Sequence, residues 1–256
     1  MKNCLLTLLA IGLLSSATAQ RIHLGLNTAF AKVYLLDHGL KDDLRYAQLK
    51  SKSSALIGFS FGLETSGGNG FMMDFFFSQL ANSYKMLDVN QTQIGQRSIN
   101  CNYWNLPLML RKVSDGDRVR LSYGLGVQLS FLTKGEETIQ QVADSAKINI
   151  SANQTPPAGA IKNADGTYTV LKFEESSNTF TKMPISVVGT LGIDIQIIDN
   201  LLLSVNSRVT YTLTDMNSDE LIKGLYNNPV TAQSLEGRRA ELIWVMQFAA
   251  HYIIEW

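Results

Sequence analysis

The sequence predicts an all-β protein, an eight-stranded antiparallel up-and-down barrel that crosses a membrane with its strands. From residue 22 onward, apolar and polar residues alternate with a period of two, which is typical of strands with one apolar face. The connections between these segments are alternately long and short, as in outer-membrane barrels with short periplasmic turns and long extracellular loops. Charged residues make up 17% of the chain, below the roughly 25% of an average soluble domain.

Eight segments carry the alternating pattern. The clearest is 117–131, where seven large apolar side chains from Val119 to Phe131 share one face and small or polar residues share the other. A strand of this length exceeds the roughly 5–6 residues usual in soluble sheets. The predicted strands are 22–32, 53–65, 70–79, 98–112, 117–131, 182–198, 201–213 and 241–256.

The connections set the expected orientation. Tight turns are predicted at 65–69, 114–116 and 199–200, where the sequence offers Gly-Gly, Asp-Gly and Asp-Asn. Long loops are predicted at 33–52, 80–97, 132–181 and 214–240. An even number of strands places both termini on the periplasmic, short-turn side.

The longest of these loops, 132–181, is polar and is expected to contain a hairpin, because 167–173 alternates again. Recognition is commonly carried by variable loops on a rigid scaffold. Two interpretations remain open with equal weight: a contact site for a surface or secretion partner, and an uncommitted protective loop.

The N-terminal 19 residues predict a cleaved secretory signal, followed by a single domain over 20–256. Lys2 precedes an apolar stretch at 5–14 and a small-x-small site at 17–19, so cleavage is expected between Ala19 and Gln20. The apolar stretch is shorter than the roughly 20 residues that a spanning helix needs. Cys4 lies too early to be the cysteine of a lipoprotein signal.

The chain ends on aromatic residues in the register expected to face lipid. Trp244, Tyr252 and Trp256 share this register, and aromatic side chains are favoured at membrane interfaces. The final Trp256 is also expected to act as a signal for the barrel-assembly machinery. Outer-membrane lipid and that machinery are therefore expected partners, and the expected location is a bacterial outer membrane.

The inward register carries a small set of ionisable residues. An eight-stranded barrel is filled by side chains or holds one small ligand, so charges within it must pair. The favoured interpretation is an ionic plug that fills the lumen; a proton path or a binding site is the alternative. The expected members are Glu64, Asp74, Arg111, Arg120, Asp194, Arg208, His251 and Glu255.

No catalytic, cofactor or metal site is predicted. Cys101 is the only cysteine after the signal, and His23 and His38 have no evident partners in the sequence. The 22 basic and 22 acidic residues balance, which gives no indication of nucleic-acid binding. The alternatives to a structural or interaction protein are a membrane-embedded lipid-modifying enzyme and a soluble periplasmic lipid-binding barrel with an apolar interior.

Several segments resemble small Bacteroidetes outer-membrane barrels of the PorT-like, or "outer membrane protein beta-barrel domain", family. These are the first strand "IHLGLNTAF", the segment "NYWNLPLMLRK" and the following "LSYGLGVQLSFL". The resemblance spans nearly the whole mature chain and implies a small outer-membrane barrel, but its motifs say little about activity. The founding member's part in type 9 secretion implies, more weakly, a role in protein secretion through the extracellular loops.

Overall fold

The computed structural model describes residues 21–37, 46–51, 53–150, 156, 160–177, 180–218 and 239–255. The predicted signal, its cleavage site at Ala19 and Gln20, His38 and Trp256 lie outside these residues. The described residues form strands, turns and irregular segments; none forms a helix long and apolar enough to cross a membrane. The strands are β1 (Arg21–Asp37), β2 (Tyr46–Ser51), β3 (Ser53–Glu64), β4 (Asn69–Leu87), β5 (Gln93–Val113), β6 (Val119–Ile148), β7 (Ile161–Lys162), β8 (Tyr168–Ser177), β9 (Ile185–Ile198), β10 (Leu201–Thr212) and β11 (Arg239–Glu255).

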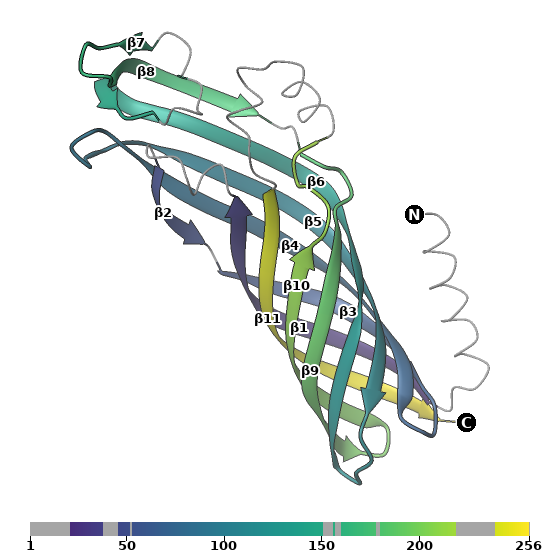
Figure 1. Cartoon of the computed structure of the whole chain (residues 1–256). Coiled ribbons are helices and arrows are strands. Elements are labelled where there is room, and N and C mark those ends of the chain that lie inside the picture. The colour runs from purple at the N-terminus through teal and green to yellow at the C-terminus, as the bar shows by residue number, and fades with distance from the viewer. Residues whose placement is uncertain are drawn as a thin grey trace.

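Eight of these strands close into a ring, in the order β1, β3, β4, β5, β6, β9, β10 and β11. The ring closes where β1 pairs with β11 in one unbroken antiparallel ladder, from Arg21 opposite Glu255 to Asp37 opposite Arg239. All of the neighbouring pairs are antiparallel, and Figure 1 shows the strands wrapping around a common axis. The prediction of an eight-stranded antiparallel barrel is therefore confirmed, and each predicted strand corresponds to one strand of the ring.

The three predicted tight turns lie together at one end of the barrel, where β11 also ends (Figure 1). The turn between β3 and β4 depends on Gly68, whose φ of 71° lies in the left-handed region that favours glycine. A Cβ at this position would lie 2.4 Å from the carbonyl oxygen of Val113. The glycine therefore allows this turn to pack against the end of β5.

The side chains of the ring are distributed inside out relative to a soluble protein. Large apolar side chains face outward, among them Ile57 at 77% exposed and Leu125 at 65%. Charged and polar side chains of the same strands are buried in the interior, including Asp74, Asp194 and Arg208. An exterior of this kind is stable only in contact with lipid, because exposed apolar surface of this extent is unfavourable in water. A soluble barrel with an apolar interior is accordingly not favoured.

An aromatic cluster marks the upper edge of the lipid-facing surface on β4 and β5. Phe75 stacks on Trp104 with ring centroids 4.8 Å apart, and Phe77 meets Trp104 edge to face at 5.3 Å. All three rings are exposed on the outside of the barrel. The next outward-facing residues along each strand are polar, Gln79 on β4 and Asn102 on β5. Such a change from aromatic to polar is expected where a strand leaves the bilayer.

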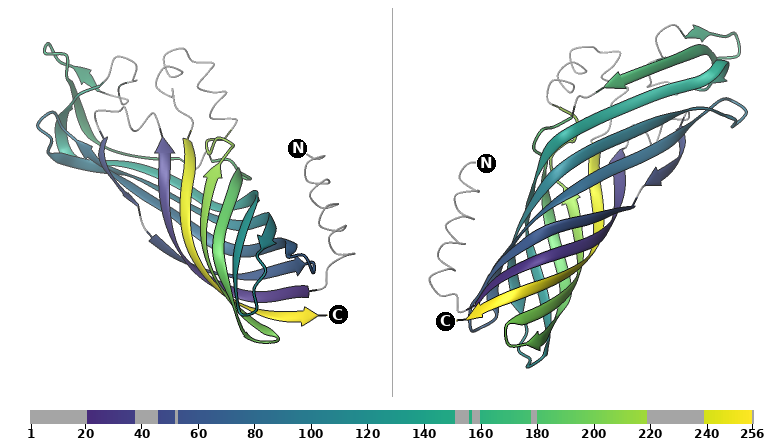
Figure 2. Two further views of the ribbon diagram at one scale, coloured as in Figure 1. Left: turned by 60° about the horizontal axis from the view of Figure 1, so that its bottom comes forward. Right: turned by 180° about the vertical axis from the view of Figure 1, so that it is seen from behind.

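Strands β4, β5 and β6 continue beyond this edge as a folded sheet, which we call the wing. It consists of 80–87, 93–102 and 132–148, extended by β2 on one side and by β8 and β7 on the other. Figure 2 shows the wing leaning to one side of the barrel axis. The hairpin expected over 167–173 is present as β7 and β8.

The connections predicted as loops over 80–97 and 132–181 contain long strands of the wing, which the sequence did not predict apart from the hairpin at 167–173. The β4–β5 connection is a short turn, in which the side-chain carboxylate of Asp88 accepts hydrogen bonds from the backbone N–H groups of Asn90 and Thr92. The segment 132–148 belongs to β6. The predicted loop at 33–52 likewise contains the end of β1 and all of β2.

The wing has an apolar core of its own. Met86, Ile94, Ile148 and Val170 pack together, each at most 5% exposed, from the tips of β4, β5, β6 and β8. Burial of a large aliphatic side chain contributes about 1.5–3 kcal/mol relative to its exposure. This cluster explains why the strands remain paired far from the bilayer.

Candidate functional site: the lumen and its outer mouth

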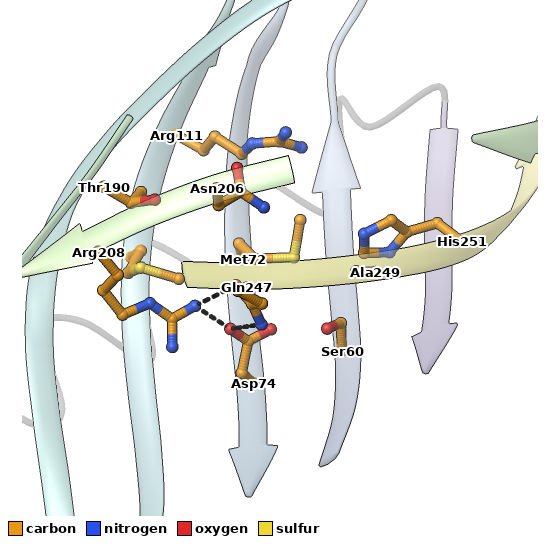
Figure 3. A pocket seen from close by; sticks show the side chains of 11 residues that line it. Ser60, Met72, Asp74, Arg111, Thr190, Asn206, Arg208, Gln247, Ala249 and His251 are labelled. Carbon is orange, nitrogen blue, oxygen red and sulfur yellow. Dashed lines mark hydrogen bonds and ion pairs between the residues drawn. The ribbon is translucent and has the colours of Figure 1, made fainter. Parts of the chain in front are cut away.

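The middle of the lumen is crossed by an ion pair between Arg208 on β10 and Asp74 on β4. In the ring order these two strands lie opposite each other, so the side chains meet across the barrel. Gln247 on β11 accepts a hydrogen bond from Arg208 at 2.9 Å and donates one to Asp74 at 3.2 Å. Figure 3 shows the three side chains converging. Both charged groups are 2% exposed, and each satisfies the other in an interior where an unpaired charge would be costly.

Two further ion pairs lie nearer the periplasmic end. Arg111 on β5 binds Asp194 on β9 through both carboxylate oxygens, at 2.6 and 2.5 Å, and Ser204 donates to the same carboxylate at 2.8 Å. Arg120 on β6 donates to Glu64 on β3 at 2.8 Å. Each pair joins strands that are not neighbours in the ring. The three pairs together form what we call the lumen braces.

Two histidines lie beside these braces. His23 on β1 and His251 on β11 are 1% and 2% exposed, with ring centroids 6.0 Å apart. Nε2 of His23 lies 3.3 Å from Glu64, and Nδ1 of His251 has no hydrogen-bond partner among the described residues. Both rings face the lumen. This gives no support to a lipid-modifying enzyme, which would need its base in contact with the bilayer.

Glu255 does not lie inside the lumen, where the sequence predicted it. Its side chain is 50% exposed at the periplasmic rim, where it pairs with Arg21 at 2.6 Å. The residue keeps the inward register, since its neighbour Ile254 faces outward, but the strand has already reached the end of the barrel. Trp244 and Tyr252 face outward, at 42% and 54% exposed.

Four charged residues form ion pairs across the outer mouth, and we call them the mouth latch. Arg239, at the start of β11, binds Asp37 on β1 at 2.8 Å and Glu137 on β6 at 3.0 Å. Arg97 on β5 also binds Glu137, at 2.5 Å, and lies 5.4 Å from the ring of Tyr46 on β2. The latch therefore ties the wing strands β5 and β6 to the opposite wall of β1 and β11.

Glu137 lies well outside the bilayer, six residues beyond the lipid-facing Phe131, or about 20 Å along the strand. Burial alone would raise the pKa of Glu137. The charges of Arg239 and Arg97, with their hydrogen bonds, outweigh burial and lower that pKa below its ordinary value. The carboxylate is therefore ionised, and the latch intact, at neutral pH.

The interior has little free space. The cavity around Arg208, Asp74 and His251 (Figure 3) measures about 20 Å³, room for little more than one water molecule. A wider polar vestibule of about 290 Å³ lies at the periplasmic end, lined by residues that include Arg21, Arg120 and Asp117. No group of three or more histidine, cysteine or acidic side chains among the described residues could hold a metal ion. The cavity in the middle of the lumen therefore has no space for a large ligand.

The mouth latch and the lumen position of Glu241 were not predicted from the sequence. Asp37, Glu137 and Arg239 fell within segments predicted to be loops, so no register was assigned to them. Glu241 lies at the start of the last predicted strand, on the same inward register as Gln247 and His251. That register was a signal that could have placed Glu241 in the lumen.

No family model matches the chain. No curated protein sequence matches it either. Among solved structures, the chain is similar to the outer membrane protein OprG from Pseudomonas aeruginosa, with 11% identity and a TM-score of 0.46 over 93% of this chain and 98% of that one. It is also similar to Neisserial surface protein A, with 10% identity and a TM-score of 0.43 over 90% and 96% of the two chains.

A third similar structure is Ail, the attachment invasion locus protein of Yersinia pestis, in complex with the heparin analogue sucrose octasulfate. The identity is 9% and the TM-score 0.41, over 91% of this chain and 98% of that one. The closed ring and the inside-out distribution of side chains establish the fold independently of these similarities. The protein is a small outer-membrane β-barrel.

Proposed function

We propose that the protein is a non-porous outer-membrane barrel that presents the wing to a partner at the cell surface. The observation that carries this proposal is the contrast between the two halves of the molecule. The lumen is crossed by three buried ion pairs, and above them the mouth latch joins opposite walls. The strands β4, β5 and β6 nevertheless continue far beyond the lipid-facing surface as a sheet with its own core.

The outward face of the wing is suited to polar contacts. Along β5 it presents Gln96, Ser98, Asn100 and Asn102, whose amides and hydroxyls can both donate and accept hydrogen bonds. Gln96 and Asn100 are exposed. The apolar side chains of the same segment, such as Ile99, point to the inner face and are buried. A polar face on a rigid sheet is appropriate for reversible recognition of a protein or glycan.

The resemblance to PorT-like proteins makes a surface or secreted protein of a type 9 pathway one candidate partner. No family model supports that specific role. The absence of a bilayer-facing histidine among the described residues favours an interaction protein over a lipid-modifying enzyme.

Photocrosslinking in intact cells tests the proposal. A crosslinking amino acid at Asn100, on the exposed face of the wing, should give discrete adducts with a surface component. The same residue at Leu125, which faces lipid, is the matched control and should give no such adducts. Absence of adducts from Asn100 would contradict the proposed recognition role, and solute flux through vesicles that contain the purified protein would contradict the closed lumen.

A further inference from the structure

A narrow cavity lies in the upper lumen, between the mouth latch and the Arg208–Asp74 ion pair. Phe76, which lies 5.8 Å from the guanidinium of Arg208, forms part of its wall. Much of the remaining wall is apolar, with Val33 and Val245 among the lining residues. The cavity measures about 10 Å³, which is space for one species the size of a water molecule.

Three oxygen atoms of residues that line this cavity have no hydrogen-bond partner among the described residues. They are Oε1 of Glu241, Oγ1 of Thr210 and the hydroxyl of Tyr103, which has only the thiol of Cys101, a weak hydrogen-bonding group, beside it. Their residues come from β11, β5 and β10 and are 7%, 3% and 1% exposed. Buried polar atoms are nearly always satisfied, and each unsatisfied one costs about 1–3 kcal/mol. Three of them at one cavity indicate a binding site.

Charge balance gives a second reason to expect a ligand. The lumen braces pair Arg208 with Asp74, Arg111 with Asp194 and Arg120 with Glu64. The mouth latch contains two bases and two acids: Arg97, Arg239, Asp37 and Glu137. Among the described residues buried in the lumen, Glu241 is thus the one carboxylate without a basic partner.

We propose that Glu241, with Tyr103 and Thr210, binds a single small monovalent cation in the upper lumen. One carboxylate balances one positive charge, and the size of the cavity limits the ligand to an ion such as sodium, potassium or ammonium. Oxygen atoms are the ligands that hard cations prefer. A cation at this place would interact with the carboxylate and both hydroxyl oxygens, and would fix β11, β5 and β10 around the mouth.

A proton or a water molecule explains the unpaired carboxylate and the neighbouring oxygens less well than a cation does. Protonation would neutralise Glu241 and supply one hydrogen-bond donor, which can serve only one further oxygen of the site. A water molecule could satisfy hydrogen bonds but would leave the carboxylate charge without compensation in a largely apolar wall.

The unfolding of the purified, refolded protein in urea tests the inference. At constant ionic strength, the urea midpoint should be higher in sodium or potassium chloride than in the chloride of N-methyl-D-glucamine, a cation too large for the cavity. The midpoint should rise as the small cation is increased, because a ligand that binds the folded state stabilises it. Glu241→Gln should abolish the dependence.

The matched control is Glu136→Gln, which removes an equal charge from a carboxylate that is 46% exposed and pairs with Lys134. This variant should respond to cations as the unchanged protein does. If Glu241→Gln fails to refold, crystals of the unchanged protein soaked in rubidium chloride should show an anomalous peak in contact with the Glu241 carboxylate. An identical midpoint in all cations, or an infrared band of a protonated carboxyl at neutral pH that is lost in Glu241→Gln, would overturn the inference.

Discussion

Arg208 reaches across the barrel from β10 to form a buried ion pair with Asp74 on β4, the strand directly opposite it in the ring. The pair joins two walls that share no backbone hydrogen bonds. Together with Gln247, it fills the middle of the lumen, where an open barrel would hold water. The contribution of this ion pair to the stability of the barrel can be measured separately from recognition of a partner by the wing.

Asp74→Asn should destabilise the barrel, because it leaves the Arg208 guanidinium buried without a compensating charge. Loss of one partner of a buried ion pair typically costs about 3–5 kcal/mol of unfolding free energy. The double variant Asp74→Leu with Arg208→Met removes both charges and should recover most of that loss. Urea unfolding of the refolded proteins in detergent provides the measurement. Equal stability of Asp74→Asn and the unchanged protein would show that the pair does not brace the barrel.

Gly126→Ala on β6 should impair folding, because a Cβ at this position would lie 2.0 Å from the carbonyl oxygen of Leu108. Overpacking of a close approach typically costs about 1–3 kcal/mol, and here the backbone of β5 would have to move. Gly189→Ala on β9 is the matched control, since a Cβ there meets nothing within 4 Å. The heat-dependent gel shift of the folded barrel reports on both variants. A normal yield of folded Gly126→Ala would contradict the close packing of β5 against β6.

Glu137→Gln should loosen the wing, because both Arg97 and Arg239 lose the carboxylate that joins them. We expect faster protease cleavage within the wing, while the barrel remains folded. Glu136→Gln, next in the chain but exposed, should be cleaved at the unchanged rate. If the two variants are cleaved alike, the latch does not hold the wing.

Acidification should weaken the same latch. The pKa of Glu137 is lowered in the folded protein from an ordinary value of 4.5, so its stabilising contribution is fully present above about pH 4.5. That contribution is lost as the pH falls through the lower, folded-state value. Protease cleavage of the wing should therefore accelerate below pH 4.5, and the acceleration should be smaller in Glu137→Gln. An unaltered pH profile in Glu137→Gln would exclude Glu137 as the titrating group.

The barrel could be predicted from the sequence because each ring strand has one apolar and one polar face within the bilayer. Beyond the bilayer the two faces exchange character, so that polar side chains face outward and apolar side chains face inward. On β5 the outward Trp104 gives way to the polar Asn102 and Asn100, while the buried Cys101 and Ile99 face inward. The apolar residues thus change faces within one strand. A segment predicted to be a loop therefore continues as a strand of the wing.

The pairing of the lumen charges could not be predicted from the sequence. The inward register identified Asp74 and Arg208, but their contact depends on which strands lie opposite each other across the closed ring. The mouth latch was missed for a different reason. Arg239 and Glu137 lie beyond the alternating bilayer segments, in strands that the period-two pattern alone did not reveal.

The orientation of the barrel strands and the exposure of the wing are tested most directly by nitroxide labels in lipid vesicles, on a Cys101→Ala background. Labels at Ile57 and Leu125, 77% and 65% exposed on the barrel exterior, should collide with dissolved oxygen and be shielded from a water-soluble nickel chelate. A label at Asn100, on the outward face of the wing, should be accessible to the chelate. Free access of the chelate to Ile57 and Leu125, or its exclusion from Asn100, would contradict a lipid-embedded barrel with a water-exposed wing.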